Sequence, residues 1–114
     1  MSRSERRLRR SDRLRNRKDF LRVNRTARRR TGAHFLALFA PSRAPRARRL
    51  GLTVGKRVGN AVERNRVKRR VREWFRRERA LLPPGTDLVV IARRGAAQLD
   101  GREIETELAA LAQR

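Results

Sequence analysis

The spacing of apolar residues changes several times along the chain, and each change predicts a new element of secondary structure. The first regular segment follows Asn16, a residue type that is suited to cap a helix. Phe20 and Val23 then lie three residues apart, and Asp19 favours the positive N-terminal end of a helix. The pattern therefore predicts a helix over residues 17–25.

Three later segments alternate between two faces with the period of a β-strand. Residues 34–40 and 87–93 are apolar on both faces, so both strands need cover, and the second is expected at the centre of a sheet. Residues 50–55 alternate leucine and valine with glycine and threonine, and this bare face would let a ligand approach the backbone. Residues 41–49 contain two prolines and predict a loop, while the chain near Thr31 leaves room for one more short strand.

The longest predicted helix covers residues 60–81, after Gly59 and before Pro83. Its apolar residues form a single stripe that consists of Val67, Val71, Trp74 and Phe75. Polar and basic side chains cover the rest of its circumference: Asn65, Arg69 and Arg76 opposite the stripe, Lys68 and Arg72 on one flank, and Arg66 and Arg70 on the other. The helix is therefore expected to dock along the stripe and to present cations elsewhere.

A closing helix is predicted after residue 100, because Asp100 and Glu103 have the spacing of a capping box. The order helix, strand, strand, helix, strand, helix is typical of an α+β fold, in which a small mixed β-sheet packs with three helices. Residues 16–114 are expected to form this fold as one domain. Residues 1–15 are basic and poor in apolar side chains, which predicts a flexible arm.

The charge of the chain indicates the kind of partner. Its 114 residues include 33 Lys and Arg but only 11 Asp and Glu, giving a formal charge of +22. A charge of this size repels itself unless a polyanion neutralises it, and the planar fork of Arg suits phosphate. The chain has no Cys, which excludes disulfides and thiol catalysis, and no apolar run approaches the roughly 20 residues of a membrane span. We therefore expect a cytoplasmic protein with no membrane or small-molecule partner.

Candidate catalytic residues are few. A nuclease that acts alone needs clustered carboxylates or paired histidines, whereas the acidic residues here are scattered and fit helix caps and ion pairs. The single histidine, His34, is interpreted as a partly buried structural or RNA-contacting residue. The sequence GKRVGN, residues 55–60, lacks the spacing of a P-loop. Binding of nucleic acid, mainly through its phosphates, is the function that the composition favours.

One segment carries a family resemblance. VGKRVGNAVERNRVKRRVRE, residues 54–73, resembles the signature of the bacterial ribonuclease P protein component, whose RNR core falls here on Arg64, Asn65 and Arg66. RLRNRKDFLRV resembles the first helix of that family, and HFLALF, RLGLTVGKR and DLVVIARRGA resemble its strands. The resemblance implies an α/β sandwich similar to a domain of a small-subunit ribosomal protein, with a left-handed βαβ crossover.

The resemblance also implies a function. Proteins of this family are subunits of a ribonucleoprotein endoribonuclease that removes the 5′ leader of precursor tRNA. The RNA subunit carries catalysis with Mg²⁺ that is held mainly by RNA, and the protein contributes no catalytic residues and binds no metal by itself. The matching surface for the RNA subunit consists of Lys56, Arg57, Asn60, Arg64, Asn65, Arg66, Lys68, Arg69 and Arg72. The matching cleft for the leader consists of Phe20, Asn24, Leu36, Leu38, Thr53, Arg57 and Arg93.

Two cleft positions depart from the family, because Asn24 and Leu38 stand where aromatic residues are frequent. Each stacking partner that is lost is worth about 1–3 kcal/mol, so leader binding is expected to depend more on Phe20, the backbone and cations. Two alternative functions remain at this point. One is a ribosomal-type protein that only scaffolds RNA, and the other is a nuclease that acts alone.

Overall fold

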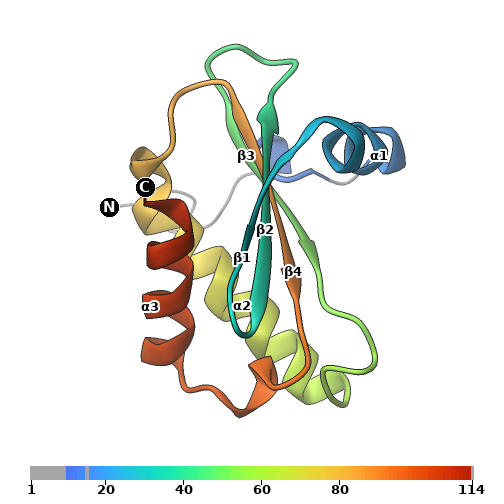
Figure 1. Cartoon of the computed structure of the whole chain (residues 1–114), viewed down its shortest axis with the longest axis vertical. Coiled ribbons are helices and arrows are strands. Elements are labelled where there is room, and N and C mark those ends of the chain that lie inside the picture. The colour runs from blue at the N-terminus through green and yellow to red at the C-terminus, as the bar shows by residue number, and fades with distance from the viewer. Residues whose placement is uncertain (1–9, 15, 114) are drawn as a thin grey trace.

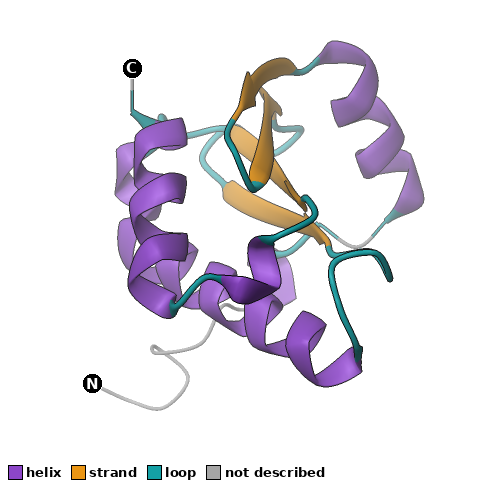
Figure 2. Ribbon diagram, turned by 60° about the horizontal axis from the view of Figure 1, so that its bottom comes forward, coloured by secondary structure: helices purple, strands orange, loops and turns teal. Residues whose placement is uncertain are grey.

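A computed structural model of the chain describes residues 10–14 and 16–113. The α-helices are α1 (Arg17–Thr26), α2 (Ala61–Glu78) and α3 (Gly101–Ala112). The strands are β1 (Arg28–Thr31), β2 (Phe35–Pro41), β3 (Arg48–Thr53) and β4 (Thr86–Ala92). Short 3₁₀ turns are η2 (Arg10–Asp12), η3 (Arg79–Leu81) and η4 (Ala96–Gln98). Helix α1 covers one face of the sheet, and α2 and α3 cover the other (Figures 1 and 2).

The sheet has the order β1-β2-β4-β3 and is mixed. β1 and β2 form an antiparallel hairpin, β2 pairs antiparallel with β4, and β3 pairs parallel with β4. Helix α2 is the crossover that joins the two parallel strands (Figure 1). The predicted α+β fold, the central position of β4 and the extra strand near Thr31 are all confirmed.

The larger core lies between the sheet and the helices α2 and α3. The predicted stripe on α2 is confirmed, because Val67, Val71, Trp74 and Phe75 are all at most 2% exposed. The predicted caps at Asn16 and Asp100 are both confirmed, since each side chain accepts a backbone hydrogen bond at the start of its helix. The structure adds a capping box at the start of α2, formed by Asn60 and Glu63. The stripe fixes the rotation of α2 about its axis, and the cap fixes where the helix begins.

A smaller core lies under α1, where Val23 packs with Leu38 and Val89. The Phe20 ring lies against β3, since a Cβ added at Gly51 would sit 2.9 Å from the ring atom Cζ. Here the bare face of β3 therefore receives a side chain of the protein itself, and not a ligand. Gly55 is different, because nothing lies within 4 Å of an added Cβ at that position.

The edges of two predicted segments are shifted in the structure. β3 begins at Arg48, inside the predicted loop 41–49. Two tertiary contacts hold this part of the strand, because Arg48 Nε donates to the Leu82 carbonyl at 2.7 Å and Arg49 donates to Asp87. The packed chain also begins before residue 16: Leu14 is 4% exposed and its amide donates to the Leu50 carbonyl at 2.8 Å. The first nine residues of the predicted arm lie outside the described residues.

The partner of Arg49 is Asp87, the one charged residue that is fully buried in the described chain. Its carboxylate accepts from Arg49 Nε and Nη2, both at 2.9 Å, and from Arg22 Nη2 at 2.5 Å. The bond to Asp87 raises the pKa of Arg49 above its ordinary value. Because Arg22 belongs to α1, Arg49 to β3 and Asp87 to β4, this network fastens the helix to two strands of the sheet.

A second carboxylate holds the β1–β2 hairpin. Glu107 on α3 accepts from the backbone amides of His34 and Phe35 at 2.7 and 2.8 Å, and its other oxygen lies 2.8 Å from His34 Nδ1. His34 is thus partly buried and held by Glu107, which agrees with its structural interpretation.

Among the described residues, none of the helices combines the length and apolar character that crossing a bilayer requires.

We predict that Asp87→Asn destabilises the protein by about 3 kcal/mol, because the substitution leaves two cations facing a neutral group in a buried site. Urea unfolding followed by the fluorescence of Trp74, the single tryptophan, measures the change. Glu105→Gln is the control, since the ion pair of Glu105 with Arg77 is exposed and is worth at most about 1 kcal/mol. Equal stability of the two variants would contradict the role given to Asp87.

Candidate RNA interface

The two flanks of α2 have different roles. Val67 and the rest of the apolar stripe face the sheet, so residues on either side of the stripe point toward different neighbours. We call Arg66, Arg70 and Arg77 the α3 flank, because each of them contacts the α3 side of the molecule. We call Arg64, Lys68 and Arg72 the β3 flank, which lies on the opposite side of the stripe at four-residue intervals.

The α3 flank is occupied by contacts within the protein. Arg66 donates from Nη1 to the Leu99 carbonyl at 3.1 Å and from Nη2 to the Ala97 carbonyl, so it holds the segment that leads into α3. The Arg70 guanidinium covers Gly101, where an added Cβ would lie 2.9 Å from Cζ. Arg77 pairs with Glu105, and this hydrogen bond raises the pKa of Arg77.

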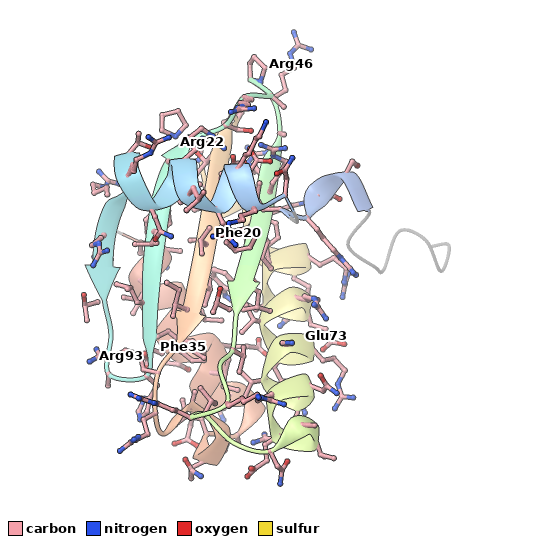
Figure 3. All side chains as sticks on the ribbon, turned by 90° about the vertical axis from the view of Figure 1, so that its right-hand side faces the viewer. Phe20, Arg22, Phe35, Arg46, Glu73 and Arg93 are labelled. Atoms are coloured by element: carbon pink, nitrogen blue, oxygen red, sulfur yellow. The ribbon has the colours of Figure 1, made fainter. Side chains whose placement is uncertain are left out.

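The β3 flank carries cations that have no partner within the described residues, and so does the outer ridge of α2, which consists of Asn65 and Arg69. The side chains of Arg64, Lys68, Arg69 and Arg72 make no hydrogen bond or ion pair with any residue in the described part of the chain. Asn65 and Arg69 are exposed on the ridge, where Glu73 also projects outward (Figure 3). The two arginines of the RNR core therefore differ, because Arg64 remains available and Arg66 does not.

The loop between β3 and α2 extends this basic surface to the end of the sheet. Lys56 and Arg57 are exposed there, and they share a hollow of about 580 Å³ with Arg93 and Arg94, which follow β4. Thr53 and Ile91 also line the hollow. Arg93 Nη1 donates to the Gly32 carbonyl at 2.9 Å, which holds this side chain at the turn between β1 and β2 (Figure 3).

The predicted leader cleft is only partly gathered in one place. Thr53, Arg57 and Arg93 all line the hollow, and Leu36 pairs with Ile91 across the sheet beside it. Leu38 is fully buried in the smaller core, so its side chain does not line an open surface. The reason is that α1 covers the half of β2 around Leu38 and leaves the half around Leu36 partly open.

The two remaining cleft residues lie on α1. Phe20 is partly buried between the helix and Gly51 of β3 (Figure 3). Asn24 is exposed. The sequence prediction did not include Ile91 and Arg94, which the structure adds to the hollow. The signal for Ile91 was present in the period of β4, since Ile91 lies between Val89 and the predicted Arg93 on the same face. Arg94 follows the end of the strand, and the period of β4 does not predict its place in the hollow.

Asn60, also predicted to face the RNA subunit, has a local task. Its side chain accepts from the Glu63 amide at 2.8 Å, while Glu63 accepts from the Asn60 amide at 2.9 Å. The residue therefore sets the start of α2, from which the β3 flank is presented. Its side-chain oxygen is committed to this capping box.

The chemistry that this surface supports is the binding of a polyanion. Among residues 10–14 and 16–113, no three His, Asp or Glu side chains come together as a metal site. Most carboxylates are instead held in caps or ion pairs, as Glu63 and Asp87 illustrate. What the surface does offer is a row of guanidinium and ammonium groups, which suits a phosphate backbone.

Known proteins share this sequence and this fold. A family model described as Ribonuclease P matches residues 8–114. The ribonuclease P protein component of Syntrophobacter fumaroxidans is 47% identical over 106 residues, covering 92% of this chain and 88% of the relative. That of Desulforapulum autotrophicum is 44% identical over 101 residues, covering 89% and 86% of the two chains.

Solved structures agree with the sequence relatives. The RNase P protein from Thermotoga maritima is 35% identical, with a TM-score of 0.79 and coverage of 90% of this chain and 96% of that one. The RNase P protein from Staphylococcus aureus is 29% identical, with a TM-score of 0.81 and coverage of 88% and 91%. The family match spans nearly the whole chain, and it includes both the basic helix and the hollow. The chain therefore belongs to the ribonuclease P protein family.

Proposed function

We propose that this protein is the protein subunit of a ribonuclease P, which assists the removal of the 5′ leader from precursor tRNA. The observation that carries the proposal is a row of cations that form no ion pair within residues 10–14 and 16–113. It begins with Arg72 on the β3 flank of α2, passes through Arg64 and the β3–α2 loop, and ends in the hollow beside Arg93. Such a run can contact two RNA segments at once, and the family membership of the chain supports the RNA subunit as one of them.

The RNA subunit is assigned to the β3 flank and the ridge of α2. Arg64, Lys68, Arg69 and Arg72 would contact its phosphates directly, with Asn65 between them. Asn60 and Arg66 would act indirectly, because Asn60 caps the helix and Arg66 holds the segment before α3. Affinity that rests on phosphate contacts should fall steeply with salt, since binding releases counterions from the RNA.

The leader is assigned to the hollow and to the open part of the sheet next to it. Arg57 and Arg93 would contact leader phosphates, while Leu36 and Ile91 offer an apolar floor for the bases. Phe20, the aromatic residue of α1, packs against the same smaller core as Leu36 and Ile91. A groove of this kind binds single strands with little demand on sequence.

Catalysis is assigned to the RNA subunit, and its Mg²⁺ ions are expected to be held mainly by RNA. The described residues do not bring three potential metal-binding side chains together. The contribution of the protein would be charge neutralisation, because two polyanionic RNAs repel one another as they approach. The basic run lowers this repulsion, and the hollow positions the leader.

Reconstitution tests the function. With the RNA subunit encoded by the same organism, at low Mg²⁺ concentration, the protein is expected to stimulate cleavage of precursor tRNA at the 5′ end of the mature sequence. The protein without the RNA subunit is the control, and cleavage by it alone would favour an independent nuclease. A protein that binds the RNA subunit without stimulating cleavage would favour a scaffold, and either result would overturn the proposal.

The two arginines of the RNR core should respond differently to substitution. Arg64→Gln is expected to weaken RNA-subunit binding and to lower the salt slope, d log K/d log[salt], by about one, because one phosphate contact is lost. Arg66→Gln is expected to destabilise the protein by about 1–3 kcal/mol, because two carbonyls lose a charged donor. Salt titrations of RNA binding and urea unfolding of both variants measure these effects. The reverse assignment of the two effects would refute the separation of the flanks.

Arg93→Gln should weaken binding of precursor tRNA only when a leader is present. The expected loss is about fivefold in the affinity of the holoenzyme, equivalent to about 1 kcal/mol for one exposed ionic contact. Affinities for precursor tRNA and for leaderless tRNA provide the comparison, and Arg102→Gln on the exposed side of α3 is the matched control. An equal loss for both tRNAs would remove Arg93 from the leader site.

A further inference from the structure

The chain before α1 folds against the edge of the sheet, far from the RNR core. Arg13 bridges Leu50 of β3, and the Leu14 amide donates to the Leu50 carbonyl at 2.8 Å. One residue earlier, Asp12 Oδ2 lies 3.0 Å from Arg79 Nη1 at the end of α2. η2 accordingly lies beside β3 and near the C-terminal end of α2 (Figure 3). The position of Arg13 is therefore fixed from both sides.

The direction of the Arg13 side chain follows from this pairing. Neighbouring residues of an extended segment point to opposite faces, and Leu14 is buried in the smaller core under α1. Arg13 thus points to the other face, toward α2, where Arg72 lies on the β3 flank and Arg76 follows one turn later. The Nε atoms of Arg13 and Arg76 are shielded from solvent and have no hydrogen-bond partner among the described residues.

In the protein alone, the positive charges of Arg13 and Arg72 repel one another. Burial, and then the positive charge of Arg13, lower the pKa of Arg72 below its ordinary value. Elsewhere the fold places a carboxylate between adjacent arginines, as Asp87 does for Arg22 and Arg49. Arg13 and Arg72 have no hydrogen bond or ion pair to a carboxylate in residues 10–14 and 16–113. An anion shared by the two guanidinium groups would remove the repulsion.

We infer that Arg13, Arg72 and Arg76 form a composite site for a backbone phosphate of RNA. A phosphodiester has two non-bridging oxygens, which can accept from guanidinium groups of both segments. An RNA chain fits better than a single free anion, because Lys68 and Arg64 continue the series along α2 at intervals of about 6 Å. This inference rests on the proposed function, in which the β3 flank contacts the RNA subunit.

The site has a consequence for the N-terminal segment. A phosphate bound across Arg13 and Arg72 ties residues 10–14 to α2, so RNA binding and docking of the segment stabilise each other. The RNA surface would then extend from the start of α2 to its far end. The sequence prediction placed Arg13 in an arm and gave it no individual role, and it included neither Arg13 nor Arg76 in the site.

A double-mutant cycle tests the inference. The full chain and its Arg13→Gln, Arg72→Gln and doubly substituted variants are titrated with the RNA subunit and, separately, with a 20-base-pair RNA duplex. We expect each single substitution to weaken binding about fivefold and to lower the salt slope by about one. The double variant should lose little more than either single one, because both side chains share one phosphate. Independent losses that multiply to about 25-fold would overturn the shared site.

A matched control and a stability measurement complete the test. Arg46→Gln removes the same charge from an exposed loop far from this site, and it should change affinity less than twofold (Figure 3). In chloride buffer, thermal unfolding of Arg13→Gln and Arg72→Gln should occur at or above the wild-type temperature, because a repulsion is removed. A lower unfolding temperature with an unchanged salt slope would assign Arg13 a purely structural role and overturn the inference.

The outcome separates this inference from the proposed function. If the wild-type protein stimulates cleavage but Arg13→Gln binds both RNAs normally, the composite site is wrong and the function stands. If the wild-type protein does not stimulate cleavage but the cycle shows coupling with the duplex, the site is right and the function is wrong. Inorganic phosphate that competes with the duplex equally well for wild type and for the double variant would indicate general charge screening, and would also overturn the site.

Discussion

The scarcity of negative charge is the constraint on which this structure depends. The chain has 11 acidic and 33 basic residues. Most of the acidic residues that the structure describes bind groups of the protein itself. Asp87 fastens α1 to the sheet, and Glu107 holds the hairpin. Glu63 and Glu103 complete the capping boxes of α2 and α3. These contacts leave the β3 flank of α2 with no acidic partner in the described structure. The excess charge is thereby concentrated on surfaces that an RNA can reach.

Burial of the α2 stripe turns this charge into a surface with a direction. A basic segment in solution would present its cations on all sides, but Val67, Val71 and Trp74 fix the rotation of the helix. One flank then supports α3 through Arg66 and its neighbours, and the other is left for a ligand. An oriented row of cations loses less conformational entropy on binding than a disordered one. The core of the protein therefore contributes to RNA binding without touching RNA.

Local patterns predicted more of the fold than of the site. Apolar periodicity and capping residues depend on neighbours within a few positions, so the α2 stripe and the caps at Asn16 and Asp100 could be read from the sequence. The role of Arg66 could not, because its partners are backbone carbonyls about 30 residues away along the chain. The burial of Leu38 likewise depends on where α1 lies across the sheet. A family motif therefore indicates which segment matters, while tertiary contacts decide what each side chain in it does.

The β3–α2 loop is where the two proposed RNA surfaces meet. Lys56 and Arg57 line the hollow, and the same loop leads directly into the capped start of α2. The loop is anchored, since Val58 is 7% exposed and its amide donates to the Gly55 carbonyl at 3.0 Å. If α2 shifted on its RNA, the few residues of this loop would therefore transmit the shift to the hollow. Because this connection is short and packed, a leader bound in the hollow, as proposed, would be held at a fixed place relative to the RNA proposed to bind along α2.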